Sequence, residues 1–307
     1  MNAGGSGVIE ALTGTWGPRV VWLAVGIIGA WSIGDALDGR SSAVRVVVAI
    51  VGWSAWGVGV VALVVPSTFG LTIIRMVNAL ACGAAAVSWI DGAAPAPGAA
   101  FAACALIAGL LIGGAEFGQR CAQASAYGDE QRFLLRPPAA FLPPVAVAGL
   151  IWTAAIVSAP LLLASRNWAI GGLVAVICVL LTWLLLPRFH TLSRRWIVLV
   201  PAGVVVHDQV VLAETLMVPR LQVVGLELAP AGTEAADFTG PATGHAVEVR
   251  MHSMINALLA PTKDSPRGRA LHVQSFIISP SRPGAVLRAA RNGFDRPARA
   301  TRRCRRR

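Results

Sequence analysis

Lysine is almost missing from this chain of 307 residues, since 25 of its 26 basic side chains are arginine. A phosphate-binding P-loop needs a lysine inside its glycine-rich loop, and a protein kinase needs one on a strand. The single lysine, Lys263, lies in the segment Ala-Pro-Thr-Lys-Asp-Ser, which has neither context. The sequence therefore excludes these two kinds of nucleotide-driven chemistry.

Motifs for metal binding and nucleophilic catalysis are also absent from the sequence. The five cysteines form no Cys-x-x-Cys pair, and the five histidines, which all follow residue 187, match no ligand spacing. No HExxH, GxSxG or GxGxxG motif occurs. The sequence therefore predicts no catalytic residue, no metal site and no cofactor, and we expect a protein that is not an enzyme.

Charge is scarce in the first 187 residues, which hold eight arginines and seven acids, whereas the last 120 residues hold 18 basic and eight acidic residues. A helix needs about 20 apolar residues to cross the hydrocarbon core of a bilayer. Six such stretches predict a transmembrane domain over residues 1–187, with helices at about 16–34, 46–65, 71–90, 99–117, 141–164 and 168–186. The N-terminus lacks a basic segment and an early apolar core, so we expect the first span, and not a cleavable signal peptide, to direct insertion.

The distribution of arginines predicts the orientation of the spans, because loops rich in Lys and Arg stay on the cytoplasmic side. The segment after the sixth span begins with Arg188, and the 118–140 loop carries three arginines, whereas the 91–98 loop has none. Six spans then place both termini in the cytoplasm, in the inner (cytoplasmic) membrane of a cell. Arg40 and Arg45 dissent, because this topology assigns their loop to the outer side.

Polar side chains inside a span are costly in lipid and often mark a functional site. The candidates are Arg75 in the third predicted span, Asn78 on the same helical face, and Glu116 at the end of the fourth span. This face is either a polar seam or a snorkelling arginine beside an asparagine that packs between helices. We expect Arg75 and Glu116 to lie within reach of each other or of a shared water. Small residues spaced four apart over 105–113 predict close helix packing.

After residue 187 the hydrophobic pattern changes to that of short strands separated by turns. The predicted strands cover residues 196–200, 204–207, 210–212, 215–218, 221–228, 246–250 and 271–278. A helix should follow over 281–291, with Ser281 as its cap, Pro283 in its first turn and Gly293 at its end. We therefore expect a small domain of short strands with one C-terminal helix over residues 188–292.

This order of elements resembles the pleckstrin-homology-like (PH-like) domains that follow transmembrane helices in bacterial proteins. The closest segments are Arg-Arg-Trp-Ile-Val-Leu-Val-Pro-Ala-Gly-Val-Val-Val-His at 194–207, Leu-Met-Val-Pro-Arg-Leu-Gln-Val-Val-Gly-Leu-Glu-Leu at 216–228 and Ile-Ile-Ser-Pro-Ser-Arg-Pro-Gly-Ala-Val-Leu at 277–287. The whole chain is similar to bacterial multi-pass membrane proteins with a C-terminal PH-like domain. The resemblance covers residues 194 to about 292 and implies that this domain is a small β-barrel closed by its C-terminal helix, without implying an activity.

Two further segments are rich in charge. The 118–140 loop is either a solvated loop or one whose charged residues pair locally or touch the C-terminal domain. The 293–307 tail is basic, and we expect it to be disordered. Basic segments near a membrane are attracted to anionic lipid, whereas a basic face interleaved with aromatic residues, typical of nucleic-acid binding, is missing. The predicted contacts with the membrane surface are Arg194, Arg195, Arg302, Arg303, Arg305, Arg306 and Arg307.

These features predict a six-helix bundle that presents a cytoplasmic PH-like domain. As a scaffold or sensor, that domain would bind a protein partner or anionic lipid headgroups. The alternative is a small-molecule or lipid transporter regulated by the domain. A polar cavity containing Arg75, Asn78 and Glu116 would favour transport, whereas a closed, dry bundle would favour scaffolding.

Overall fold

The computed structural model describes residues 16–261, 265–266 and 268–294, and its chain divides into two compact units. The transmembrane unit extends to Ser125 and resumes over Leu142–Ser193. The second unit, called the module below, combines Ala126–Phe141 with the chain from Arg194 onward. The module is therefore assembled from two separate segments, whereas the sequence predicted a single segment that begins at residue 188.

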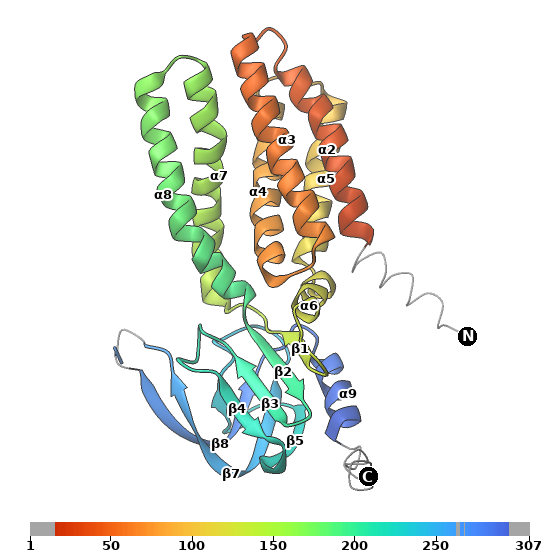
Figure 1. Ribbon diagram of the computed structural model, residues 1–307, viewed down its shortest axis with the longest axis vertical. Helices are drawn as coiled ribbons and strands as arrows, with labels where there is room; N and C mark the ends of the chain where they lie inside the picture. Colours follow the sequence, from red (N-terminus) through yellow and green to blue (C-terminus); the bar gives the residue numbers. More distant parts are fainter. Residues whose placement is uncertain (1–15, 262–264, 267, 295–307) are drawn as a thin grey trace, which may run out of the picture. The chain divides into compact units, whose positions relative to one another are not determined.

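Six helices of the transmembrane unit are long and apolar enough to cross a membrane, as predicted (Figure 1). They are α2 (Gly17–Ala36), α3 (Ser42–Val64), α4 (Thr68–Ile90), α5 (Pro95–Gly113), α7 (Leu142–Ala164) and α8 (Trp168–Ser193). Serine caps begin two of them, because the hydroxyl of Ser41 accepts a bond from the α3 backbone and that of Ser67 from the α4 backbone. The chain is thus a multi-pass membrane protein by the length and composition of its helices.

The fourth predicted span is two helices in the structure. α5 ends at Gly113, and α6 (Ala115–Ala124) follows after Gly114, whose backbone is extended with ψ 147°. The apolar pattern ran through this break because Phe117 continues it, but Phe117 and Cys121 are buried side chains of α6. Glu116 consequently lies in the first turn of α6 and not at the end of a membrane span.

The sixth helix runs seven residues beyond the predicted end at Leu186. α8 continues through Pro187 to Ser193, and the side chains of Arg188 and Thr191 donate hydrogen bonds to carbonyl oxygens of the preceding turn. Pro187 lacks a backbone N–H, and the helix nevertheless continues through it with these side-chain bonds in place. His190 therefore belongs to the transmembrane unit, and its assignment to the C-terminal domain was wrong.

Two tryptophans join α2 to α3 by reciprocal hydrogen bonds. The Trp22 indole donates to the carbonyl oxygen of Trp56 at 3.1 Å, and the Trp56 indole donates to that of Trp22 at 3.0 Å. Each ring lies over a glycine of the other helix, because a Cβ on Gly26 would come within 2.3 Å of Trp56 and one on Gly59 within 2.4 Å of Trp22. This tryptophan clasp gives two lipid-embedded helices both shape complementarity and polar bonds.

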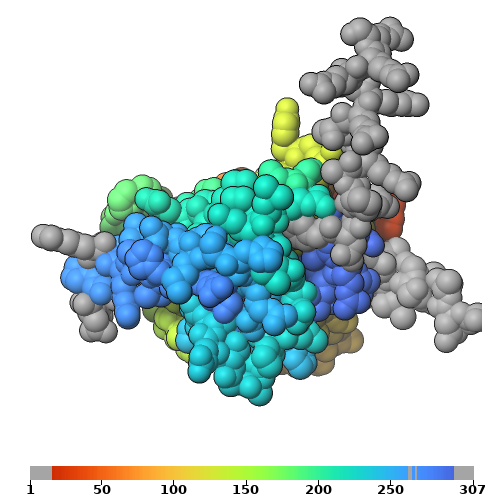
Figure 2. All heavy atoms as spheres, turned by 90° about the horizontal axis from the view of Figure 1, so that it is seen from below, coloured from red at the N-terminus to blue at the C-terminus, as the bar shows by residue number. Residues whose placement is uncertain are grey.

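The module contains two four-stranded sheets (Figure 1). The first has the order β1-β2-β3-β4, with β1 (Gln131–Leu134), β2 (Trp196–Val200), β3 (Gly203–His207) and β4 (Leu216–Pro219), all antiparallel. The second has the order β5-β7-β8-β6, with β5 (Val223–Leu228), β6 (Ala236–Asp237), β7 (Val247–Leu259) and β8 (Arg269–Ile278). Residues of the module, coloured teal to blue, form much of the surface seen in Figure 2.

Several strand boundaries differ from those predicted. β7 continues to Leu259, past its regular alternation, because a register shift between Arg250 and Ile255 changes which residues face inward. The predicted strand at 210–212 is instead a turn that forms one isolated bridge, between Leu212 and Leu259. Among the described strands the two sheets do not close into a single barrel. The structure therefore has two sheets and a helix where the sequence predicted a barrel.

The strand β1 comes from the loop between α6 and α7, and hydrogen bonds on both sides hold this loop in the module. β1 pairs with β2, and the residues after it make further backbone bonds. The N–H of Leu135 donates to the carbonyl oxygen of Arg195 at 2.8 Å, and the N–H of Arg136 donates to that of Ser279 at 2.8 Å. The N–H of Ser281 donates to the carbonyl oxygen of Leu134 at 2.8 Å. The loop is thus a structural part of the module and not a solvated connection.

The helix α9 (Pro283–Phe294) follows β8, and Pro283 lies in its first turn as predicted. Ser281 does not cap it, because the Ser281 hydroxyl is buried without a hydrogen-bond partner in the described part of the chain. The described helix also continues past Gly293. The tail assigned to residues 293–307 lies, from residue 295, outside the described residues.

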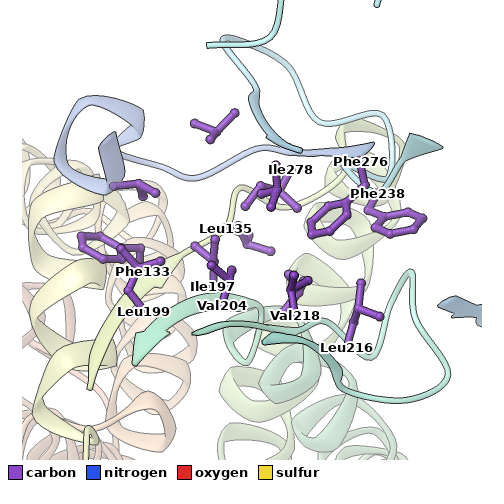
Figure 3. Packing of buried hydrophobic residues seen from close by; sticks show 14 of the residues in the cluster. Phe133, Leu135, Ile197, Leu199, Val204, Leu216, Val218, Phe238, Phe276 and Ile278 are labelled. Atoms are coloured by element: carbon purple, nitrogen blue, oxygen red, sulfur yellow. The ribbon is translucent and has the colours of Figure 1, made fainter. Parts of the chain in front are cut away.

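A single apolar core fills the space between the two sheets and α9 (Figure 3). Phe238 and Phe276 stack with ring centroids 5.2 Å apart, and Phe133 of β1 belongs to the same cluster. Val286 and Ala290 of α9 complete it. The alternating inward residues of the strands explain this core, since successive side chains of a strand point to opposite faces.

Candidate functional site

Of the three polar residues predicted inside the membrane, Asn78 lies at a contact between helices of the transmembrane unit. Asn78 is buried, its amide nitrogen lies 3.8 Å from the Cys82 sulfur, and a Cβ on Gly109 of α5 would come within 2.8 Å of that nitrogen. Gly109, part of the predicted small-residue face, thus makes room for the asparagine. This geometry favours the interpretation of Asn78 as a residue that packs between helices.

Of the two charged members of this group, Glu116 lies in α6, and Arg75 of α4 interacts with α6. Glu116 lies 3.9 Å from Arg120 one turn further along α6, and Arg75 interacts electrostatically with the thiol of Cys121. Burial raises the pKa of Cys121 to about 11, against the opposing effect of the Arg75 charge. The thiol is therefore neutral near pH 7 and is not an activated nucleophile. The proximity of the Arg75 and Glu116 head groups stays a prediction.

A polar contact between α4 and α8 escaped the sequence analysis. The Thr72 hydroxyl lies 3.1 Å from the Nδ1 atom of His190, and the His190 ring meets Phe69 edge-on with centroids 5.5 Å apart. No local pattern identifies this contact, because His190 follows the apolar run that defined the sixth span. The signal would have been the continued helical spacing past Pro187.

On the module, three side chains gather around Trp196. The Trp196 indole stacks on the His207 ring, with centroids 5.0 Å apart and planes inclined by 20°. The guanidinium of Arg132 lies 5.3 Å from the indole centroid, and that of Arg194 lies 6.0 Å from it. We call Arg132, Arg194, Trp196 and His207 the Trp196 cluster.

The fold explains why the Trp196 cluster forms. Trp196 and His207 lie opposite each other in the β2–β3 pair, and Arg132 is a diagonal neighbour of Trp196 on β1. Arg194 directly follows α8 and reaches the same ring. The cluster therefore requires both segments of the module. Sequence reasoning selected Arg194 but missed Arg132, Trp196 and His207, because it did not place the 118–140 loop in the sheet.

The electrostatics of the Trp196 cluster are positive. Burial and the charges of Arg194 and Arg132 lower the pKa of His207, while Asp208 acts in the opposite direction. The Nδ1 atom of His207 lies 3.0 Å from the Thr215 hydroxyl, and within the described chain its Nε2 atom is buried without a hydrogen-bond partner. Arg132 also pairs with Glu130 at 2.6 Å. Arg132, Arg194 and Glu130 together therefore carry one net positive charge.

Arg195, predicted at the membrane surface, is instead an internal residue of the module. Its side chain and that of Asp208 are each 1% exposed, and they pair at 2.7 Å. The same guanidinium donates to the carbonyl oxygens of Arg136 and Thr239. The prediction for Arg195 was wrong because adjacent residues of an extended chain point in opposite directions, and only Arg194 lies by the Trp196 ring. The other predicted contacts, Arg302, Arg303, Arg305, Arg306 and Arg307, lie outside the described residues.

The described residues contain no group of three or more His, Cys, Asp or Glu side chains able to hold a metal ion. Comparison with known proteins adds no assignment, because no protein-family model, curated protein or solved structure matches the chain. The interpretation of function therefore depends on the geometry of the two units.

Proposed function

We propose that the chain is a non-enzymatic membrane sensor or scaffold whose module binds the phosphate of anionic lipid headgroups at the Trp196 cluster. The observation that supports this most directly is the meeting of two arginines on one indole. An arginine is well suited to phosphate because its planar guanidinium donates paired hydrogen bonds. The buried Nε2 atom of His207 adds a polar group to the same cluster.

The connections of the chain support a membrane ligand over a soluble one. Arg194 immediately follows Ser193, the last residue of α8, and Arg132 lies in the 16-residue segment between α6 and α7. Neither arginine can move far from the membrane-spanning helix beside it, because Arg194 adjoins the end of α8 and Arg132 lies ten residues before the start of α7. Both arginines are therefore tethered near the surface where anionic headgroups are concentrated.

The order of elements supports a PH-like interpretation of the module. Two small antiparallel-rich sheets pack around one core, and a C-terminal helix completes it. The additional strand β1 departs from an arrangement in which the domain simply follows the last span. We propose that this strand couples headgroup binding to the bundle, since the chain passes between the two units three times.

We further propose the cytoplasmic orientation of both termini in the inner membrane. The arginines of the 118–140 loop and of the segment after α8 support it. The dissenting Arg40 pairs with Asp91 at 2.5 Å, which joins the two loops assigned to the outer side. Transport is not advanced as a second function, because Arg75, Asn78 and Glu116 do not line the cavity of ≈ 490 Å³ found in the bundle.

The test uses the full chain in phosphatidylcholine nanodiscs with and without phosphatidylglycerol, because a fragment starting at residue 188 would lack β1. Histidine NMR follows the titration of His207, with the exposed His252 as an internal control for general surface potential. A phosphate close to His207 favours its charged form, so anionic lipid should raise the pKa of His207 beyond any general effect of the surface potential.

Paired variants identify the site in this experiment. The double variant Arg132→Gln/Arg194→Gln should abolish the extra rise in the pKa of His207. The matched control Arg269→Gln/Arg288→Gln removes two exposed charges elsewhere on the module and should keep it. The same titration of His207 in both kinds of nanodisc would refute headgroup binding here and leave a protein partner as the ligand to seek.

A further inference from the structure

A cavity of ≈ 490 Å³ lies within the transmembrane unit, between α2, α3, α4 and α7. In Figure 1, α7 and α8 form a pair beside the group of α2 to α5, and the cavity occupies part of this boundary. Ligand sites are typically clefts of about 300–1,000 Å³ with an apolar lining and a few polar groups. This cavity has that size and that kind of lining.

Small residues create the space. Gly34 and Gly52 both line the cavity, and no atom lies within 4 Å of the position that a Cβ would take on either. Gly26 also lines it, but its open position is filled by the Trp56 ring. A smaller cavity of ≈ 120 Å³ shares Gly52 and Val157 with the first.

The polar groups of the cavity lie at one end. Asp38 and Arg45, which flank the start of α3, are its charged lining residues. Arg40, in the same connection, pairs with Asp91, whereas neither Asp38 nor Arg45 has an ion pair among the described residues. An apolar cavity that ends in a cation and an anion, neither of them ion-paired within the described part of the chain, has the character of a site for an amphiphile with both charges.

We propose that this cavity holds an acyl chain of an amine-bearing phospholipid, with its phosphate on Arg45 and its ammonium group on Asp38. An acyl chain gains little by leaving other lipid chains for apolar side chains, because both surroundings are equally apolar. Selectivity therefore comes from the two charge-assisted pairs, and the shape of the cavity provides the position of the chain. This site is separate from the Trp196 cluster and takes a different headgroup.

The test offers the delipidated full chain in mild detergent an equimolar mixture of phosphatidylethanolamine, phosphatidylglycerol and phosphatidylcholine with identical acyl chains. Native mass spectrometry then counts the lipids retained. The wild-type protein should retain phosphatidylethanolamine preferentially. Gly52→Trp should reduce retention about tenfold, because its ring occupies the cavity. Gly57→Trp is the matched control on the same helix, since Gly57 also has open space but does not line the cavity.

Two exposed variants keep the proposal testable if Gly52→Trp does not fold. Arg45→Gln should reduce retention about tenfold through loss of the phosphate pair. Asp38→Asn should remove the preference for phosphatidylethanolamine over phosphatidylglycerol. Because the Trp196 cluster is proposed to bind anionic headgroups, Arg132→Gln/Arg194→Gln should lower the retention of phosphatidylglycerol alone and leave that of phosphatidylethanolamine unchanged, which separates the two sites. Equal retention by Gly52→Trp and Gly57→Trp, or retention without headgroup preference in the wild type, would overturn the proposal.

Discussion

The transmembrane unit and the module achieve close packing by different means. Between α2 and α3, bulky rings sit on glycines and donate hydrogen bonds across the helix pair. In the module, apolar side chains of two sheets and a helix form one core, with a buried ion pair beside β2. Lipid offers no hydrophobic driving force between helices, so shape and polar bonds must act there, whereas burial from water stabilises the module.

The largest effect expected is that of Asp208→Asn, which leaves the Arg195 guanidinium buried without its anion. Breaking a buried ion pair by removing one partner costs about 3–5 kcal/mol. Hydrogen exchange of the β2 and β3 amides in the full chain should report this loss. Glu227→Gln breaks the exposed Glu227–Arg250 pair and should cost less than about 1 kcal/mol. Equal losses would show that burial of the pair is unimportant.

Phe133→Ala tests whether the loop strand β1 stabilises the module as its core does. Phe133 is 7% exposed and belongs to the module core, so its truncation should cost about 3 kcal/mol or somewhat more. The exposed Gln131 on the same strand provides the control Gln131→Ala. Faster exchange should appear in β2 and β3 and not only in β1. Exchange that accelerates in β1 alone would indicate a strand attached to the module without stabilising it.

Gly59→Val tests the tryptophan clasp, because the added side chain would occupy space that the Trp22 ring already fills. Overpacking of this kind costs about 1–3 kcal/mol. Thermal unfolding in detergent, followed by tryptophan fluorescence, should show a lower midpoint. Gly57→Val adds the same group to the same helix where no atom lies within 4 Å. If both variants unfold at the same temperature, the contact between Gly59 and Trp22 does not stabilise the α2–α3 pair. The contrast drawn between the transmembrane unit and the module core would then be wrong.

The smallest effect concerns the pH dependence of the module. Burial and the Arg194 charge lower the pKa of His207 below that of the unfolded chain, so the unfolded state binds a proton more readily. Stability should therefore fall as the pH decreases through about 6.5, the ordinary pKa of histidine, and level off below the pKa of the folded state. Arg194→Gln should raise the pKa of His207 in phosphatidylcholine nanodiscs, as measured by NMR. A control substitution, Arg288→Gln, should leave it unchanged, and an unchanged or lower pKa in Arg194→Gln would contradict the assignment.

The two units also differ in how well the sequence predicted them. All six membrane helices were found, because length and apolar composition are local properties that lipid imposes on every spanning helix. The module strands β2, β3, β5 and β8 were found from their short apolar runs. The strand β1 was left undecided, since its pairing with β2 joins residues more than 60 positions apart. Such pairing depends on the register of another segment and leaves little local pattern.

The candidate sites show the same division. Composition placed arginines near the membrane, but the sequence alone did not separate Arg194, beside Trp196, from Arg195, which is buried on Asp208. It likewise identified Asn78 as polar within a span without revealing that Gly109 accommodates it.

By itself the sequence determined the six helices of the described chain that are long and apolar enough to cross a membrane, and the strand-rich, basic domain that follows them. Both follow from the solvent that each stretch of residues requires. Only the tertiary structure decided that the module takes a strand from the loop between α6 and α7, that the Trp196 cluster combines both segments, and that glycines leave an apolar cavity ending at Arg45. These features depend on which distant side chains meet, and that is settled by packing between elements and not by the preference of any one of them.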